Sequence, residues 1–180
     1  MAPMLGGLAV APGFGMPAMS TGDSGRFGGN MDWNALVEGN IVYLRVQQPG
    51  ALLYLGDAHA RQGDGETSQY ALETSMDVTF SVDVIKGESI DLPRVESPTA
   101  IMALGQAGSL DPALGSATAG LVDWLRKDYA LTTSEAAQVL GSAVQYRVAN
   151  LAGRSVGVAA ALDKALLPPS RHVVSARADK

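Results

Sequence analysis

Hydrophobic and polar residues alternate most regularly over residues 76–85, where Met, Val and Phe take turns with Asp, Thr and Ser. A period of two is typical of a strand that buries one face and exposes the other to water. β-Branched and aromatic residues predict another strand at 41–46. A turn at 47–50 and a partner strand at 51–55 would complete a hairpin with it. Residues 67–73 are expected to be a strand as well. The pattern therefore predicts a β-rich first part of the chain.

The pattern changes to helical spacing in the second part of the chain. An Asp-Pro pair at residues 111–112 is typical of a helix start, and apolar residues then recur every three or four positions, which predicts an amphipathic helix over 112–129. Thr132 and Glu135 have the spacing of a capping box, ahead of an apolar face that continues to Leu151. We therefore expect two antiparallel helices joined by a short link.

These elements predict an α+β fold. Its first portion, residues 1–94, is expected to be a β-rich sandwich or barrel-like unit that carries the candidate active-site loop. Residues 95–180 are expected to form a small α+β lobe, in which strands at 100–104 and 155–162 flank the two antiparallel helices. The tail from residue 168 is expected to be loose.

The composition indicates a globular protein and excludes several classes of function. Of the 180 residues, 47% are hydrophobic and 17% charged, which is typical of a chain with a buried core. The net charge of −5 argues against nucleic-acid binding, which needs a basic face. The chain has no cysteine and no apolar run of the length that a membrane span needs. We therefore expect a cytoplasmic protein that binds neither nucleic acid nor membranes.

Candidate chemistry is concentrated in residues 56–66, which carry three carboxylates, one histidine and three glycines. We expect this stretch to be a loop between two strands, where scaffolds usually place reactive groups. Asp57 and His59 stand two apart and would face one side of an extended strand end. Asp64 and Glu66 have the same spacing. The plainer interpretation is a solvated surface hairpin, because Asp-Gly pairs are ordinary turn formers.

Two motifs in this chain resemble the signature of the acetamidase/formamidase family. They are Gly-Asp-Ala-His-Ala-Arg-Gln-Gly-Asp-Gly-Glu at residues 56–66 and Gly-Gly-Asn-Met-Asp at 28–32. Residues 8–12 resemble the segment that precedes the Gly-Gly-Asn-Met-Asp motif in the family. The turn at 96–99 with the following helices resembles the family's C-terminal portion. The resemblance covers residues 4–165 in the order and spacing of the family.

The resemblance implies hydrolysis of the carbon–nitrogen bond of small linear amides such as formamide or acetamide, which gives ammonia and a carboxylate. Family members are usually longer, and this chain resembles their C-terminal part without the N-terminal half. Two hypotheses stay open: an amidase, active alone or completed by a partner chain, and a noncatalytic fragment that serves as a structural or oligomerising half. The apolar first 30 residues and the absence of the N-terminal half should leave exposed hydrophobic surface, which leads us to expect a homo-oligomer.

Attack of water on an amide needs an activated water, a stabilised oxyanion and a proton for the leaving nitrogen. We expect Asp64 and Glu66 to be catalytic carboxylates, with Glu73 as a further candidate base. Asp57 and His59 are candidate ligands of a divalent metal, with zinc the first candidate from the ligand types. A base with its orienting carboxylate is the metal-free alternative for this pair. No organic cofactor is expected.

Substrate contacts are expected from Asn30, Asp32, Gly63 and Gly65. The glycines allow the backbone to approach a ligand closely. The alternative for Asn30 and Asp32 is a structural role, in which their side chains bond the backbone of a turn. The second histidine, His172, lies in the expected tail and is assigned no role.

Overall fold

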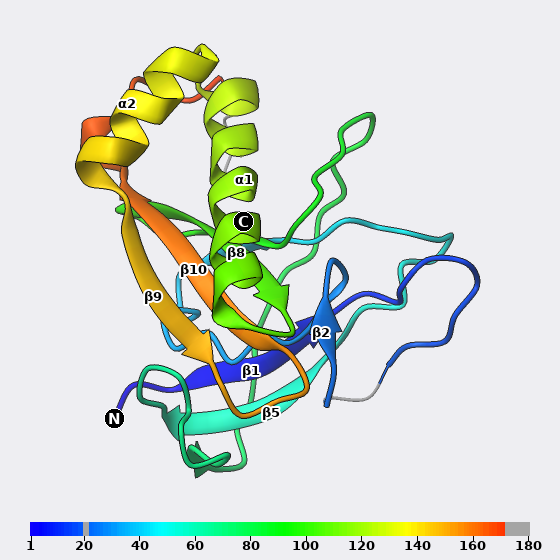
Figure 1. Ribbon diagram of the computed structural model, residues 1–180. Coiled ribbons are helices and arrows are strands. Elements are labelled where there is room, and N and C mark those ends of the chain that lie inside the picture. Colours follow the sequence, from blue (N-terminus) through cyan, green and yellow to red (C-terminus); the bar gives the residue numbers. More distant parts are fainter. Residues whose placement is uncertain (20–21, 172–180) are drawn as a thin grey trace.

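Two five-stranded antiparallel sheets and two α-helices form an α+β fold in the computed structural model, which describes residues 1–19 and 22–171 (Figure 1). The predicted fold class is confirmed. The first sheet has the strand order β2-β3-β1-β5-β6. Its strands are β1 (Met4–Ala9), β2 (Ser24–Gly25), β3 (Gly28–Asn30), β5 (Tyr54–Arg61) and β6 (Leu72–Glu73).

Strand β1 is the centre of the first sheet and pairs with β3 on one side and with β5 on the other. Gly7 stands opposite Asn30 of β3 and opposite Gly56 of β5. The two sequence motifs, at residues 28–32 and 56–66, therefore lie on either side of one strand.

The second sheet has the strand order β4-β7-β8-β10-β9, and helix α1 lies across β8 and β10 (Figure 1). Neither described helix is long and apolar enough to cross a membrane. The elements of this part are β4 (Ile41–Tyr43), β7 (Arg94–Glu96), β8 (Ala100–Ala107), α1 (Leu110–Asp128), α2 (Thr133–Ala143), β9 (Gln145–Asn150), β10 (Val156–Asp163) and a 3-10 turn at Lys164–Leu166.

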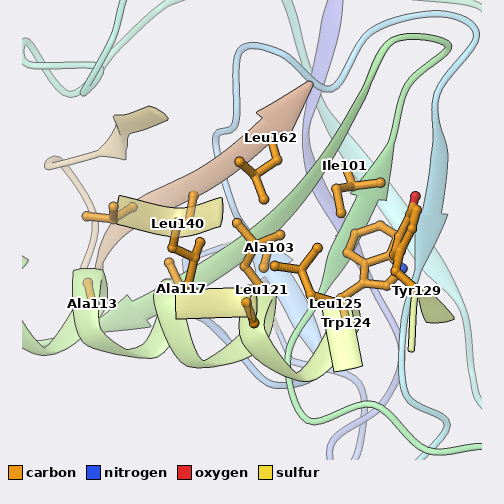
Figure 2. Close-up of a cluster of buried hydrophobic side chains, with 13 residues drawn as sticks. Ile101, Ala103, Ala113, Ala117, Leu121, Trp124, Leu125, Tyr129, Leu140 and Leu162 are labelled. Carbon is orange, nitrogen blue, oxygen red and sulfur yellow. The ribbon is translucent and has the colours of Figure 1, made fainter. Parts of the chain in front are cut away.

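Strand β8 is buried on both faces, which explains why its sequence is a nearly continuous apolar run. Ile101 and Ala103 point to the helices and pack near Leu121 of α1 (Figure 2). Met102 and Leu104 alternate with them and join a second apolar cluster, which includes residues of β1. The second sheet is thus the middle layer between the helices and the first sheet.

The two helices are confirmed, but their ends differ from the prediction. Helix α1 starts at Leu110 with Ser109 as its N-cap, and the Asp-Pro pair falls inside its first turn. Helix α2 begins with the predicted capping box but ends at Ala143. The expected apolar helix face up to Leu151 is wrong, because residues 145–150 form β9 and pair with β10.

The strands predicted at 100–104 and 155–162 are confirmed as parts of β8 and β10, whereas the hairpin predicted between 41–46 and 51–55 is wrong. Strand β4 pairs with β7 instead, and residues 51–53 are not strand. The prediction paired neighbours in the sequence, but β4 finds its partner about 50 residues later.

The strand predicted at 76–85 is also wrong: these residues form no strand, and of 67–73 only Leu72–Glu73 does. A strand exists only where a second strand completes its hydrogen bonds, and alternation alone does not supply that partner. The predicted tail beyond residue 171, with His172, lies outside the described residues.

The capping box of α2 gives a test of the stability of this lobe. The Glu135 carboxylate accepts hydrogen bonds from the backbone N–H and the hydroxyl of Thr132 (2.8 and 2.7 Å), and these bonds lower the pKa of Glu135. A lowered folded-state pKa stabilises the fold above the unfolded value of 4.5, and this contribution is lost as pH falls through the folded-state pKa. We expect Glu135→Gln to lower the Tm at pH 7 but not at pH values below the folded-state pKa.

Thermal unfolding followed by circular dichroism at both pH values measures this effect. Glu38→Gln, an exposed carboxylate outside every helix and strand, is the matched control and should leave the Tm unchanged. Equal Tm values of Glu135→Gln and the unaltered chain at pH 7 contradict the prediction.

Candidate functional site

The stretch expected as a loop is mostly strand. Strand β5 continues to Arg61, so Asp57 and His59 stand within the first sheet, and only residues 62–66 form a turn. His59 is paired with Met4 on the neighbouring strand β1 and with Glu73 on the neighbouring strand β6. The sheet, not a loop, therefore fixes the positions of these side chains.

His59 is 1% exposed, and Gln62 sets the direction of its ring. The Gln62 amide nitrogen donates to the carbonyls of Asp32 (2.5 Å) and Ala149 (3.2 Å), so its oxygen faces His59 Nδ1 at 2.9 Å. A carbonyl oxygen only accepts, which places a proton on Nδ1. In the neutral ring, Nε2 is then the nitrogen with the free lone pair.

His59 Nε2 points into carboxylates. It lies 3.3 Å from Asp57 Oδ1 and 3.3 Å from Glu73 Oε2, and it has no hydrogen-bond partner among the described residues. Burial lowers the pKa of His59, but the Gln62 hydrogen bond and the nearby charges of Asp57 and Glu73 outweigh it and raise the pKa. The site thus favours a positive charge at Nε2.

Asp32 approaches the same group from the end of β3. It is fully buried with a positive φ of 42°. Its Oδ2 accepts hydrogen bonds from the side-chain amides of Asn30 (2.6 Å) and Asn150, whereas Oδ1 has no partner among the described residues. Burial and the negative charges of Glu66 and Asp57 raise the pKa of Asp32 to about 8.

Glu66 completes a cluster of four carboxylates around one imidazole. Its side chain is buried, and burial together with the charges of Asp57 and Glu73 raises its pKa although His59 opposes the shift. Two triads that share His59 have ligand atoms within 4.8 Å of one another and could hold a metal ion. They are Asp32–Asp57–His59 and His59–Glu66–Glu73.

The backbone of Gly6 in β1 forms the floor beneath two of these carboxylates. The Gly6 carbonyl accepts hydrogen bonds from the N–H groups of Met31 (2.9 Å) and Asp32 (3.1 Å). A Cβ at Gly6 would stand 2.4 Å from Asp32 Oδ1 and 2.6 Å from Asp57 Oδ2, distances that real Cβ contacts do not show. Only glycine therefore leaves these carboxylates where they are.

Asp64 is held away from this cluster by partners of its own. Its carboxylate accepts from Asn34 (2.7 Å) and from the Arg147 guanidinium (2.6 and 3.2 Å), and that guanidinium lies 5.6 Å from the Trp33 ring centre. Partial burial raises the pKa of Asp64, but these hydrogen bonds outweigh it and the pKa is lowered. Asp64 thus joins the 62–66 turn to β9.

The two glycines of the turn differ in their surroundings. Gly65 has a positive φ of 80°, and both of its backbone groups are used: its N–H donates to Val148 (2.9 Å), and its carbonyl accepts from Leu151 (2.8 Å). Gly63 has open space on the side where a Cβ would stand. Of the predicted substrate contacts, the structure brings Asn30 and Asp32 to the cluster.

Three residues of the site were not predicted from the sequence. Gln62 lies inside the motif, but nothing in the pattern distinguishes a buried glutamine from a solvated one. Asn150 stands 118 residues from Asp32 in the chain, and Gly6 precedes both motifs. Their roles follow from the pairing of β5 with β1 and from the place of β9, which spacing along the chain does not reveal.

Comparison of the sequence and the fold with known proteins identifies similar proteins. The model of the acetamidase/formamidase family matches residues 13–154. The fold resembles the acetamidase of Yersinia enterocolitica (TM-score 0.89, 35% identity) over 93% of this chain and 50% of that one. It also resembles the acetamidase of Bacillus halodurans (TM-score 0.85, 34% identity) over 92% of this chain and 55% of that one.

In a separate comparison, 72 residues (39% of this chain) are 42% identical to a stretch that makes up 17% of a Schizosaccharomyces pombe protein named provisionally as a formamidase. The chain therefore spans about half the length of the solved relatives and less of the curated one. Because the family model matches residues 13–154, well over half of the chain, the chain belongs to the acetamidase/formamidase family.

Proposed function

We propose that this chain carries the reaction site of an amidohydrolase, which cleaves the carbon–nitrogen bond of small linear amides to ammonia and a carboxylate. The observation that carries the proposal is the buried Nε2 of His59, which has no hydrogen-bond partner among the described residues and faces the carboxylates of Asp57 and Glu73 at 3.3 Å. Membership of the acetamidase/formamidase family supports this substrate class.

The donor set fits a divalent cation. In the absence of a proton or cation, the Nε2 lone pair and the carboxylates around it repel one another, and Asp32 Oδ1 also has no hydrogen-bond partner in the described ranges 1–19 and 22–171. We propose that Asp57 and His59 are the central ligands, with oxygen atoms from Asp32 or Glu73 beside them. One imidazole with carboxylates suits zinc first. A bound ion of this kind polarises a carbonyl and makes water more acidic.

The remaining side chains divide the other tasks of amide hydrolysis. Glu66, whose raised pKa makes it a readier proton acceptor, is our candidate for the base, and Glu73, half exposed in its side chain, is the candidate that solvent can reach. Asn30 Oδ1 has no partner among the described residues and can accept from a substrate N–H. Gly63 would leave room for the substrate to approach the turn.

The spacing of Asp64 and Glu66 in the sequence suggested a catalytic role for Asp64, but here we propose a positioning role for it. Its carboxylate is engaged by Arg147 and Asn34, and its pKa is lowered. A carboxylate with two such partners is a weak proton acceptor. We therefore propose that Asp64 positions the turn that carries Glu66.

Metal binding can be tested without any assay of activity. We expect the chain to bind zinc, and His59→Ala to abolish stoichiometric binding, because the imidazole is shared by both triads. Glu38→Gln is the matched control, since Glu38 is an exposed carboxylate outside both triads. Isothermal titration calorimetry and metal analysis of the dialysed protein give the stoichiometry. Equal zinc binding by His59→Ala and the unaltered chain would contradict the site.

The activity itself is tested by ammonia release from formamide and acetamide. We expect release that is lost on removal of divalent ions and in His59→Ala, and that returns when zinc is added to the unaltered chain. Failure of the zinc-loaded chain to release ammonia from either amide would favour the second hypothesis, a noncatalytic half.

The floor of the site gives a further prediction. We expect Gly6→Ala to lower zinc affinity by at least about tenfold, because its Cβ would displace the carboxylates of Asp32 and Asp57. Since those atoms are side-chain ends, the fold should survive, and circular dichroism checks this. Gly56→Ala on the neighbouring strand is the matched control, because a Cβ there meets no atom within 4 Å. Identical zinc affinities of the two variants would refute the role of Gly6.

The cellular setting and assembly follow from simpler features. We propose a cytoplasmic location, which the absence of cysteine suits. A homo-oligomer remains an expectation that rests on exposed apolar residues such as Phe14 and Met16.

A further inference from the structure

The alternating segment at residues 76–85 forms no strand in the described structure, and its side chains are exposed except for the half-buried Met76 and Val78. Every side chain from Thr79 to Ser89 is exposed, and Phe80 and Val82 are 58% and 65% accessible. Within the described part of the chain, the backbone of residues 75–87 makes no hydrogen bond to another backbone group. Figure 1 shows this part of the chain, between β6 and β7, as a long open excursion whose tip stands away from both helices.

The composition of this segment does not match its exposure. A solvated loop has no need for five apolar residues at every second position, whereas a strand with one buried face requires that spacing. Such a strand, if left without a partner, is a site where another strand can add. The segment also leaves β6 and returns to β7, and β6 is an edge strand of the first sheet. The sequence is therefore that of a strand whose partner is elsewhere.

The chains of the solved relatives indicate where that partner is. Their fold matches 92–93% of this chain, yet this chain accounts for only 50–55% of theirs. The remaining half of each relative must therefore pack outside the fold described here. We propose that the apolar face of residues 76–84 docks a β-strand from this remaining half, whether in the same chain or in a separate one. This inference does not use the proposed hydrolase activity.

A second copy of this chain fits the segment less well. The antiparallel register that matches all five apolar residues of two copies is centred on Phe80. That register places Asp77 of one copy opposite Asp83 of the other, and like charges directly opposite destabilise a strand pair. The remaining half of the family chain is therefore the occupant that we infer.

Hydrogen exchange tests the docking directly. The probe is the half of the Yersinia enterocolitica acetamidase that this chain does not cover, coexpressed with this chain and checked for folding by circular dichroism. We expect a one-to-one complex in which amides of residues 75–87 exchange at least about tenfold more slowly than in the free chain. Phe80→Asp and Val82→Asp should weaken the complex at least about tenfold, because both side chains are at the proposed contact.

Leu166→Asp is the matched control, since Leu166 is as exposed (59%) but lies outside the segment. All three variants should keep the Tm of the unaltered chain, because none of the three side chains is packed. To make the test independent of whether the probe folds alone, the same variants are placed in one continuous chain with the relative's half joined ahead of Met1. There the segment should resist chymotrypsin at Phe80, and Val82→Asp should restore cleavage.

Three outcomes overturn the proposal. They are a folded probe that forms no complex, a complex whose formation leaves residues 75–87 unprotected, and protection that appears as the concentration of this chain rises without the probe. The last result identifies a second copy as the occupant.

Discussion

Burial of one imidazole among carboxylates is the constraint on which this structure depends. His59 is almost fully enclosed, and charged groups removed from water are stable only when a partner of opposite sign or a hydrogen bond replaces the water. Gln62 satisfies Nδ1, and the side chains of Asn30 and Asn150 satisfy one oxygen of Asp32. Among the described residues, His59 Nε2 and Asp32 Oδ1 are left without a hydrogen-bond partner, and both residues belong to a triad that could hold a metal ion.

The second sheet and the two helices form a core of their own, and they also position residues of the candidate site. The central strands β8 and β10 of this sheet are largely buried. Strand β9 at the edge of that sheet brings Asn150 to Asp32 and Arg147 to Asp64. The paired strands β9 and β10 hold Asn150 in place. The helical lobe and the candidate site are therefore parts of one packed arrangement.

The sequence predicted those features of the fold and site that depend on neighbours along the chain. The capping box of α2 and the shared face of Asp57 and His59 are local and were found. Gly6 and Asn150 were missed, because strand register and long-range pairing bring them to the site. Residues 145–150 fit both a helical face and a strand, and the presence of β10 decided between them. Periodicity reports the environment of a side chain, and only the partner determines the element.

The same distinction applies to residues 76–85. Their period of two is not an error of the sequence, because the alternation records an apolar surface that the part of the fold described here does not cover. The segment begins three residues after Glu73, whose side chain is half exposed although its carboxylate lies 3.3 Å from the buried Nε2 of His59. The docked strand that we propose would cover this apolar surface. Because exclusion of water strengthens every electrostatic contact in a site, we expect any cover over the half-exposed Glu73 side chain to strengthen its contact with His59.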